Sequence, residues 1–361
     1  MSLLEEARKI INRVDAEMAE LFCERMRASQ MVAEYKKENG LKIYDRVREE
    51  ELIKRNSALV ESEELREYYV NFLRNTMAVS RQYQDRLMSG MKIAYCGTEG
   101  AFAHIATNKL FPSSRKIAYS DFESAYGAVV NGECDVAVLP IENSYNGEVG
   151  QVCDLMFSGS LYVNGITELA VTQDLLALPG AEIGDIKRVV SHPQALGQCS
   201  EYLKSHGFEQ IEYPNTALAA KHVAELCDKS VAAIASEEAA EIFGLKVLEK
   251  NINASRNNTT KFAVLSRAEN LHKKSEMGVH TILLFTVRNE AGALAKAIDV
   301  IGKHGFNMRA LRSRPMKDLL WQYYFYVEAE GNVRTDAGMN MLSELQSYCD
   351  RLKVLGTFVK D

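Results

Sequence analysis

The chain has 361 residues, of which 47% are hydrophobic and 25% are charged, and its formal net charge is −6. This length is typical of two or three domains, and the acidic balance argues against nucleic-acid binding, which requires a basic surface. The start "MSLLEEARKI" does not look like a secretory leader, and no apolar run reaches the ~18 residues of a membrane span, so a cytoplasmic protein with no membrane contact is expected.

The seven cysteines and seven histidines are scattered along the chain and show neither CxxC nor HExxH spacing. Reduced thiols and no metal site are therefore expected. The glycine-bearing turn "CGTEGAFAH" could receive an anion through backbone N–H groups, but GxGxxG spacing is absent, which argues against a dinucleotide cofactor.

Residues 1–90 are predicted to be all-helical. The segment contains no proline, and its two glycines are Gly40 and Gly90. Helices are expected over about 3–37, 44–58 and 62–88, with a break at Gly40 and a capping residue at Ser62.

The first predicted helix carries Arg25 within its apolar stripe. A structural ion pair or a snorkelling side chain would explain it, and so would an anionic ligand. Lys36 follows 11 residues later and so points in nearly the same direction. Polar residues share a face on each of the next two helices as well: Asp45, Arg48 and Glu49, then Ser80 and Gln84.

Arg8 lies 17 residues before Arg25, which is about 25 Å along one continuous helix. Both arginines therefore cannot grip one small molecule within the same subunit. If both bind substrate, Arg8 must reach a second site, which predicts a dimer with intertwined long helices. A tetramer is also compatible with this arrangement.

This set of residues resembles that of the all-helical chorismate mutases. The resemblance implies a pericyclic rearrangement of chorismate to prephenate, without nucleophile or cofactor, in which positioning and charge stabilisation supply the catalysis. It assigns Arg8, Arg25 and Arg48 to the substrate carboxylates, Lys36 and Gln84 to the ether oxygen, and Glu49 to the ring hydroxyl, with Asp45 and Ser80 in support.

Residues 91–267 alternate between short β-rich runs and helical runs, which predicts two α/β lobes with parallel sheets and a cleft between them. Three stretches at predicted strand ends are rich in small polar groups: "PIENSYNG" (140–147), "SHPQALGQC" (191–199) and "RNNTTKFAVLS" (256–266). Capped turns and helix starts would explain each of them alone.

Together these stretches resemble the prephenate dehydratase family, which implies two lobes of the periplasmic-binding-protein kind. In the implied reaction, prephenate loses its ring carboxylate and its hydroxyl and becomes phenylpyruvate. Thr260 stands at the position of the family's catalytic threonine and would assist departure of the hydroxyl. The resemblance places the following residues around the substrate: Glu142, Asn143, Ser144, Ser191, Gln194, Gln198, Lys261 and Phe262. Lys261 replaces the family's usual arginine, which predicts weaker binding of prephenate.

After a charged linker, residues 279–361 follow the order βαββαβ, which is the ferredoxin-like plan. This segment resembles an ACT domain, an amino-acid-sensing module. The resemblance implies that L-phenylalanine binds at Gly292, Ala293, Leu294, Ser313, Arg314 and Pro315. Arg312 stands where the family usually has a glutamate, so the charge there is reversed.

The sequence therefore predicts a bifunctional enzyme of phenylalanine synthesis, in which the substrates are chorismate and prephenate and L-phenylalanine is an allosteric ligand. One alternative is a chain in which only the mutase works, because Lys261 impairs the second site. Another is a non-catalytic amino-acid sensor, but such a sensor would have no use for the complete mutase set.

Overall fold

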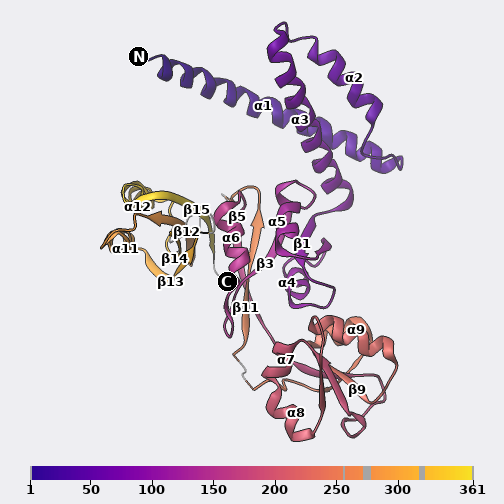
Figure 1. Ribbon diagram of the computed structural model, residues 1–361. Coiled ribbons are helices and arrows are strands. Elements are labelled where there is room, and N and C mark those ends of the chain that lie inside the picture. Colours follow the sequence, from indigo (N-terminus) through magenta and orange to yellow (C-terminus); the bar gives the residue numbers. More distant parts are fainter. Residues whose placement is uncertain (1, 255–256, 271–277, 317–321, 360–361) are drawn as a thin grey trace. The chain divides into compact units, whose positions relative to one another are not determined.

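The computed structural model describes residues 2–254, 257–270, 278–316 and 322–359 (Figure 1). The chain divides into two compact units, residues 1–92 and 93–361. Within the described residues, none of the helices combines the length and the apolar character that crossing a membrane requires.

Three helices form the first unit: α1 (Leu3–Glu38), α2 (Arg46–Ser57) and α3 (Glu63–Ser89). Each begins after a capping side chain, since Ser2, Asp45 and Ser62 each accept a hydrogen bond from a backbone N–H three residues later. The three predicted helices are confirmed, with ends within two residues of those expected. The N-terminal half of α1 projects past the other two helices (Figure 1), and its side chains up to residue 24 are all exposed.

The second unit begins with a six-stranded sheet in the order β2-β1-β3-β11-β5, with β4 paired to β3. Its strands are β1 (Lys92–Cys96), β2 (Arg115–Tyr119), β3 (Val136–Asn143), β4 (Gly147–Glu148), β5 (Tyr162–Ala170) and β11 (Thr259–Ser266). The helices of this first lobe are α4 (Phe102–Leu110), α5 (Phe122–Val130) and α6 (Gly150–Ser158).

The second lobe is built on a five-stranded sheet in the order β10-β6-β9-β7-β8. Its strands are β6 (Asp174–Ala177), β7 (Arg188–Ser191), β8 (Glu209–Glu212), β9 (Val231–Ala235) and β10 (Lys246–Glu249). Its helices are α7 (Pro193–Gln198), α8 (Ser200–His206), α9 (Thr216–Leu226) and α10 (Glu237–Phe243), with the 3₁₀ turn η1 (Ile183–Asp185). The chain thus enters this lobe after β5 and returns to the first lobe at β11.

The expectation of parallel sheets was wrong in part, because both sheets are mixed. Strand β1 runs parallel to β3, and β7 runs parallel to β8 and β9. The returning strand β11, however, runs antiparallel between β3 and β5. Its direction follows from the return between the lobes, which local strand–helix alternation does not encode. This return brings Thr260 opposite Asn143.

The C-terminal part of the second unit has the predicted ferredoxin-like order. Its elements are β12 (Val279–Val287), α11 (Ala293–Lys303), β13 (Asn307–Pro315), β14 (Tyr323–Glu330), α12 (Asp336–Gln346) and β15 (Cys349–Val359). The sheet order is β13-β14-β12-β15. Residues 319–321, expected to open the third of these strands, lie outside the described residues.

Two cores flank this C-terminal sheet. One packs the sheet against α11 and α12, and the other joins it to the first lobe through residues such as Tyr324, Tyr326 and Phe358. Where β15 passes β5, Gly356 lies so close to the backbone of Val163 that a Cβ would clash with the Val163 carbonyl. The ferredoxin-like part is therefore packed directly on the lobe that carries Asn143 and Thr260.

Candidate active sites

A polar cluster surrounds Arg25 in the helical unit. The half-buried Arg25 guanidinium donates to the Ser80 hydroxyl and, over 3.3 Å, to the carbonyl oxygen of Thr76. Burial lowers the pKa of Arg25, while the nearby Glu49 carboxylate opposes that shift. Both hydrogen-bond partners described for Arg25 are neutral, so its positive charge remains available to an anionic ligand.

Lys36 and Asp45 fix the junction between α1 and α2. The Lys36 ammonium donates to the carbonyl oxygen of Ile43 over 2.5 Å, which leaves two of its three N–H donors for a ligand. The Asp45 carboxylate caps α2 by accepting from the backbone N–H of Arg48 over 3.0 Å. The Arg48 side chain itself is exposed, 4.0 Å from Glu51. Asp45 is therefore occupied in building the site, whereas the Arg48 guanidinium is held only weakly.

Glu49 forms an ion pair with Arg81, a residue that the sequence pattern does not single out. The Arg81 guanidinium also lies over the Tyr44 ring, 5.1 Å from its centroid. Arg81 immediately follows Ser80 and so falls outside the helical spacing that singled out Ser80 and Gln84. Its contacts orient the Glu49 carboxylate, the group expected to bind a substrate hydroxyl.

Ser80 and Gln84 are buried, with exposed fractions of 5% and 8%. Among the described residues, the Gln84 side-chain carbonyl oxygen has no hydrogen-bond partner. A buried polar atom left unpaired is costly, so it commonly marks a place that a ligand completes. Arg8 does not join this cluster within one chain, because it is exposed on the projecting half of α1.

The second candidate site is a cavity of about 350 Å³ between the two lobes of the second unit. Elements of both lobes contribute to its wall: Ala101, Phe102, Asn143, Asn146, Val149, Val171, Gln173, His192, Gln194, Ala195, Gln198, Pro214, Asn215, Thr216, Asn258 and Thr260. Four of the predicted prephenate-binding residues are thus brought together in one cavity: Asn143, Gln194, Gln198 and Thr260.

Asn143 holds the Thr260 hydroxyl in a defined orientation. The Asn143 carbonyl oxygen accepts from the backbone N–H groups of Tyr145 and Asn146, both at 3.0 Å. These two bonds fix the amide so that its NH₂ group donates to Thr260 Oγ1 at 2.9 Å and to the Asn258 side-chain oxygen at 2.8 Å. Since Thr260 accepts from Asn143, its own hydroxyl proton is left to donate to a ligand in the cavity.

The second lobe contributes the short helix α7, which carries Gln194 and Gln198 along the cavity wall. The Gln198 side-chain oxygen accepts from Asn258 over 3.2 Å, which links this helix to the beginning of β11. His192 caps α7 by accepting from the backbone N–H of Gln194 over 3.3 Å. His192 and Asn258 were not selected from the sequence, although both lie in stretches that it singled out.

Three other predicted residues lie outside the cavity lining. The Ser144 hydroxyl donates to the carbonyl oxygen of Asn257 and accepts from the backbone N–H of Thr259, so it secures the beginning of β11. The fully buried Ser191 donates to the carbonyl oxygen of Ile234 over 2.6 Å. Phe262 is 2% exposed and belongs to the interior. Their contacts build the walls, and direct substrate contact by these three stays a prediction.

Glu142 and Lys261 also lie outside the lining of the cavity, and their direct contact with the substrate likewise stays a prediction. Lys261 Nζ is 3.0 Å from Glu142 Oε2, and Arg312 Nη2 is 2.7 Å from Glu142 Oε1. Burial alone would raise the pKa of Glu142, but the positive charges of Lys261 and Arg312 beside it outweigh burial and lower that pKa. Side chains alternate along β11, so Lys261 points to the opposite face of the sheet from Thr260, which lines the cavity. On that face Lys261 pairs with Glu142.

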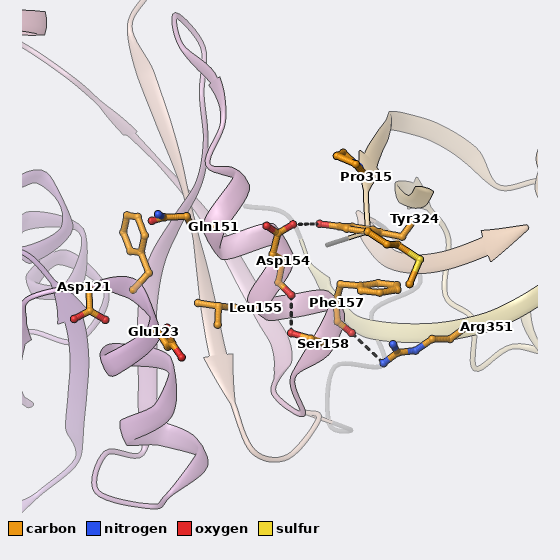
Figure 2. A pocket seen from close by; sticks show the side chains of 12 residues that line it. Asp121, Glu123, Gln151, Asp154, Leu155, Phe157, Ser158, Pro315, Tyr324 and Arg351 are labelled. Atoms are coloured by element: carbon orange, nitrogen blue, oxygen red, sulfur yellow. Dashed lines mark hydrogen bonds between the residues drawn. The ribbon is translucent and has the colours of Figure 1, made fainter. Parts of the chain in front are cut away.

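The residues predicted to bind phenylalanine are divided between different surroundings. Leu294 lines a cavity of about 320 Å³ in the C-terminal part. Pro315 lines a larger one, of about 490 Å³, between α5, α6 and the C-terminal sheet (Figure 2). Arg314 is paired with Glu148 at 2.5 Å and with Asp154 at 3.0 Å.

The remaining residues predicted to bind phenylalanine lie at the beginning of a helix or on an exposed face of a strand. Gly292 caps α11 with a φ of 82°, a left-handed conformation that glycine adopts readily, and Ala293 follows it. Ser313 is exposed on β13. Among the described residues, Leu294 and Pro315 line different cavities, and the assignment of the whole set to one ligand stays a prediction.

In the described parts of the chain, no group of three or more His, Cys, Asp or Glu side chains is arranged to hold a metal ion. The side chains at the two sites are cations, amides and a hydroxyl, which can bind carboxylates, orient a small anionic molecule and donate a hydrogen bond to a departing oxygen.

Comparisons with known proteins agree with this division. Residues 93–270 match the prephenate dehydratase family, and residues 7–85 match the chorismate mutase type II family. The chain is 31% identical to the bifunctional chorismate mutase/prephenate dehydratase of Aquifex aeolicus, over 100% of this chain and 99% of that one.

Two solved structures resemble the second unit. GqqA, described as a novel type of quorum quenching acylase, is 30% identical with a TM-score of 0.69, over 75% of this chain and 98% of that one. The prephenate dehydratase of Arthrobacter aurescens, solved in complex with L-Phe, is 26% identical with a TM-score of 0.68, over 74% of this chain and 90% of that one. Because the likeness to the Aquifex protein extends over both units, the chain belongs to the bifunctional chorismate mutase/prephenate dehydratase family.

Proposed function

We propose that the chain rearranges chorismate to prephenate in its helical unit and converts prephenate to phenylpyruvate in the cleft of its second unit. The observation that carries the second step is the hydrogen bond from Asn143 to Thr260, which leaves the Thr260 hydroxyl proton free to donate to a ligand in the cavity that Thr260 lines. The first step is supported by Arg25, Lys36 and Gln84, which retain an unneutralised charge, free N–H donors and an unpaired oxygen.

The mutase step requires positioning and charge stabilisation rather than a nucleophile. Chorismate is a dicarboxylate, and its breaking C–O bond places negative charge on the ether oxygen in the transition state. Arg25 supplies a fixed cation for a carboxylate, and Lys36 can donate to the ether oxygen. Glu49, oriented by Arg81, can accept a hydrogen bond from the ring hydroxyl.

The dehydratase step breaks two bonds of prephenate. The bond between the ring and its carboxylate breaks, and its electron pair enters the ring as CO₂ leaves. The C–O bond to the ring hydroxyl breaks at the opposite ring carbon, and the departing hydroxide takes up one proton from the solvent and leaves as water. Thr260 would donate a hydrogen bond to that oxygen as charge develops on it, while Gln194 and Gln198 orient the substrate.

The decisive test is to supply purified protein with chorismate alone and to follow chorismate loss and phenylpyruvate formation together. Formation of phenylpyruvate without any added cofactor is the expected result. Accumulation of prephenate would contradict the dehydratase assignment while leaving the mutase in place. No loss of chorismate would contradict the mutase assignment, and prephenate supplied directly would then test the second step by itself.

A dimer is the assembly that we propose for the helical unit, with a tetramer as a further possibility. The projecting half of α1 carries apolar side chains that are largely exposed in one chain, among them Leu3, Ile11, Met18 and Leu21. A second copy would cover them, because an exposed apolar surface of this kind is unfavourable in water. The same pairing would bring Arg8 of the second copy to the Arg25 cluster.

We further propose a cytoplasmic enzyme that L-phenylalanine inhibits. All seven cysteines lie in the described part of the chain and none forms a disulfide, which is typical of a reducing compartment. The inhibitor assignment is supported by the likeness to a dehydratase solved with L-Phe. Leu294 and Pro315 line different cavities in one chain. This supports a ligand site that a second copy of the chain completes.

Hydrolysis of an acyl group is the second candidate, because of the likeness to the quorum quenching acylase. A hydroxyl nucleophile requires a base that removes its proton. The described partner of the Thr260 hydroxyl is the Asn143 amide, which is a hydrogen-bond donor and cannot act as that base. The geometry therefore favours dehydration, and the absence of acylase activity on acylated amines would agree with it.

A further inference from the structure

A charged cluster lies where the C-terminal sheet meets the first lobe, next to the strands that carry Asn143 and Thr260. Glu142 of β3 forms an ion pair on one carboxylate oxygen with Lys261 of β11, at 3.0 Å, and on the other with Arg312 of β13, at 2.7 Å. All three side chains are well covered, with exposed fractions of 25% for Glu142, 28% for Lys261 and 17% for Arg312. Partial burial strengthens such pairs relative to surface ion pairs.

The pairing of β3 with β11 places this cluster beside Asn143 and Thr260. Lys261 is opposite Glu142 in the register, and the next pair along the ladder is Thr260 opposite Asn143. The register shifts between Lys261 and Phe262, immediately after these two pairs. A bulge interrupts the ladder of backbone hydrogen bonds that fixes the register of two strands. Side-chain contacts therefore contribute more to the relative position of β3 and β11 at this point.

Arg312 is itself held firmly. Its guanidinium lies over the ring of Tyr326, 5.0 Å from the centroid, and Tyr326 is 2% exposed. Two residues further along β13, Arg314 binds Glu148 and Asp154 of the first lobe. Glu148 is opposite Glu142 in the pairing of β3 with β4. Arginines from one strand therefore hold carboxylates on both sides of the turn that follows Asn143.

We propose that Arg312 is a positioning residue of the dehydratase site, which rests on the function proposed above. It fixes the Glu142 carboxylate, Glu142 fixes Lys261, and this bridge holds the ends of β3 and β11 so that Asn143 and Thr260 keep their 2.9 Å hydrogen bond. The C-terminal part of the chain thus contributes to basal catalysis, in addition to any ligand that it binds.

The test is the steady-state dehydratase rate of Arg312→Gln, with prephenate supplied directly to the full-length protein. We expect a kcat about tenfold lower than wild type and a KM within about twofold of it. The kcat falls because the variant misplaces the Thr260 hydroxyl, and small shifts of a positioned group slow the reaction strongly. Arg312→Lys should restore most of the rate, since an ammonium can still pair with Glu142. The mutase rate of the same samples should not change.

Arg309→Gln is the matched control. Arg309 lies on the same strand, but its partner Glu330 belongs to the C-terminal sheet itself, and Arg309 is 56% exposed. The control variant should keep the wild-type dehydratase rate. If Arg312→Gln also keeps the wild-type kcat, or if it lowers only the melting temperature, the proposal is wrong.

A double-mutant cycle separates action through Glu142 from any other effect. If Arg312 acts through Glu142, Arg312→Gln should cause little further loss in a Glu142→Gln background, because contacting residues are not additive. Full additivity would overturn the proposal. A wild-type protein that forms no phenylpyruvate from prephenate would refute the proposed function and this role together, whereas an active wild type with an unaffected variant refutes this role alone.

Discussion

The Thr260 hydroxyl is the group on which the dehydratase proposal depends, and its surroundings explain why a threonine suits the position. It stands on a strand rather than a loop, is 9% exposed, and accepts from an amide that is itself fixed by two backbone N–H groups. A hydroxyl held in this way needs no reorganisation as charge develops on a departing oxygen.

Thr260→Val should therefore remove most of the dehydratase activity. Valine keeps the shape and the β propensity of threonine but has no hydroxyl, so a kcat about 100-fold lower is expected if hydrogen-bond donation assists the departing group. Thr260→Ser retains the hydroxyl and should remain active, which makes it the control. Equal rates for the valine and serine variants would show that this hydroxyl has no part in the reaction.

Arg81 allows a second test at the scale of single residues. Replacement by methionine keeps much of the side-chain volume but frees the Glu49 carboxylate, so the mutase rate should fall about tenfold through lost orientation. Arg74→Met is a suitable control, because Arg74 is exposed on the same helix. The dehydratase rate should be the same in both variants. A normal mutase rate in Arg81→Met would mean that Glu49 needs no partner.

At the scale of elements, helix ends were predictable because they depend on local chemistry. Ser62 accepts a hydrogen bond at the beginning of α3, as expected, and Gly90 ends that helix with a φ of 80°. Asp45, expected inside the second helix, instead caps it. The direction of β11 was not predictable, since its partners β3 and β5 are distant in the sequence. For the same reason the sequence indicated the residue types at Glu142 and Lys261 but not the side of the strand on which each lies.

Helix α1 carries the most specific prediction at this scale, that each mutase site draws on two chains. Arg8→Ala and Arg25→Ala should each be inactive as a mutase when alone. When the two variants are unfolded, mixed and refolded together, heterodimers regain one intact site, which restores up to about a quarter of the wild-type rate by random pairing. Mixing either variant with itself is the control. No recovery on mixing would contradict a shared site.

At the scale of the whole molecule, Lys353 joins the C-terminal sheet to the first lobe. Its ammonium donates to the carbonyl oxygens of Met156 and Gly159, at 2.8 and 2.6 Å. Burial, with the charge of Arg351 as the smaller cause, lowers the pKa of Lys353 to about 8. The folded protein thus loses this proton at lower pH than the unfolded chain does, so stability attributable to Lys353 rises between about pH 8 and the usual lysine range near pH 10.4.

Lys353→Met removes that titration and provides the comparison. The melting temperature of wild type relative to the variant should increase by about 2 °C between pH 8 and pH 10, a modest change because solvent screens a partly exposed group. Other titrating groups, including the tyrosines, are present in both proteins and cancel in the difference. A difference in melting temperature that is constant with pH would show that Lys353 titrates normally in the folded state.

Phenylalanine inhibition is the prediction that requires the whole assembly. Leu294 and Pro315 lie in separate surroundings within one chain, so a ligand that contacts both sets must bridge two copies and bind the assembled state preferentially. A ligand that binds only the folded assembly raises its stability by mass action, and a concentration of 100 times Kd corresponds to about 2.7 kcal/mol. L-Phenylalanine should therefore raise the melting temperature by several degrees and lower the dehydratase rate, while D-phenylalanine serves as the control.

The charge reversal at Arg312 does not oppose this, because Arg312 is already paired with Glu142 rather than directed at a free ligand. Titration with L-phenylalanine that changes neither the melting temperature nor the rate would contradict the regulatory assignment and leave the C-terminal sheet with its positioning role alone.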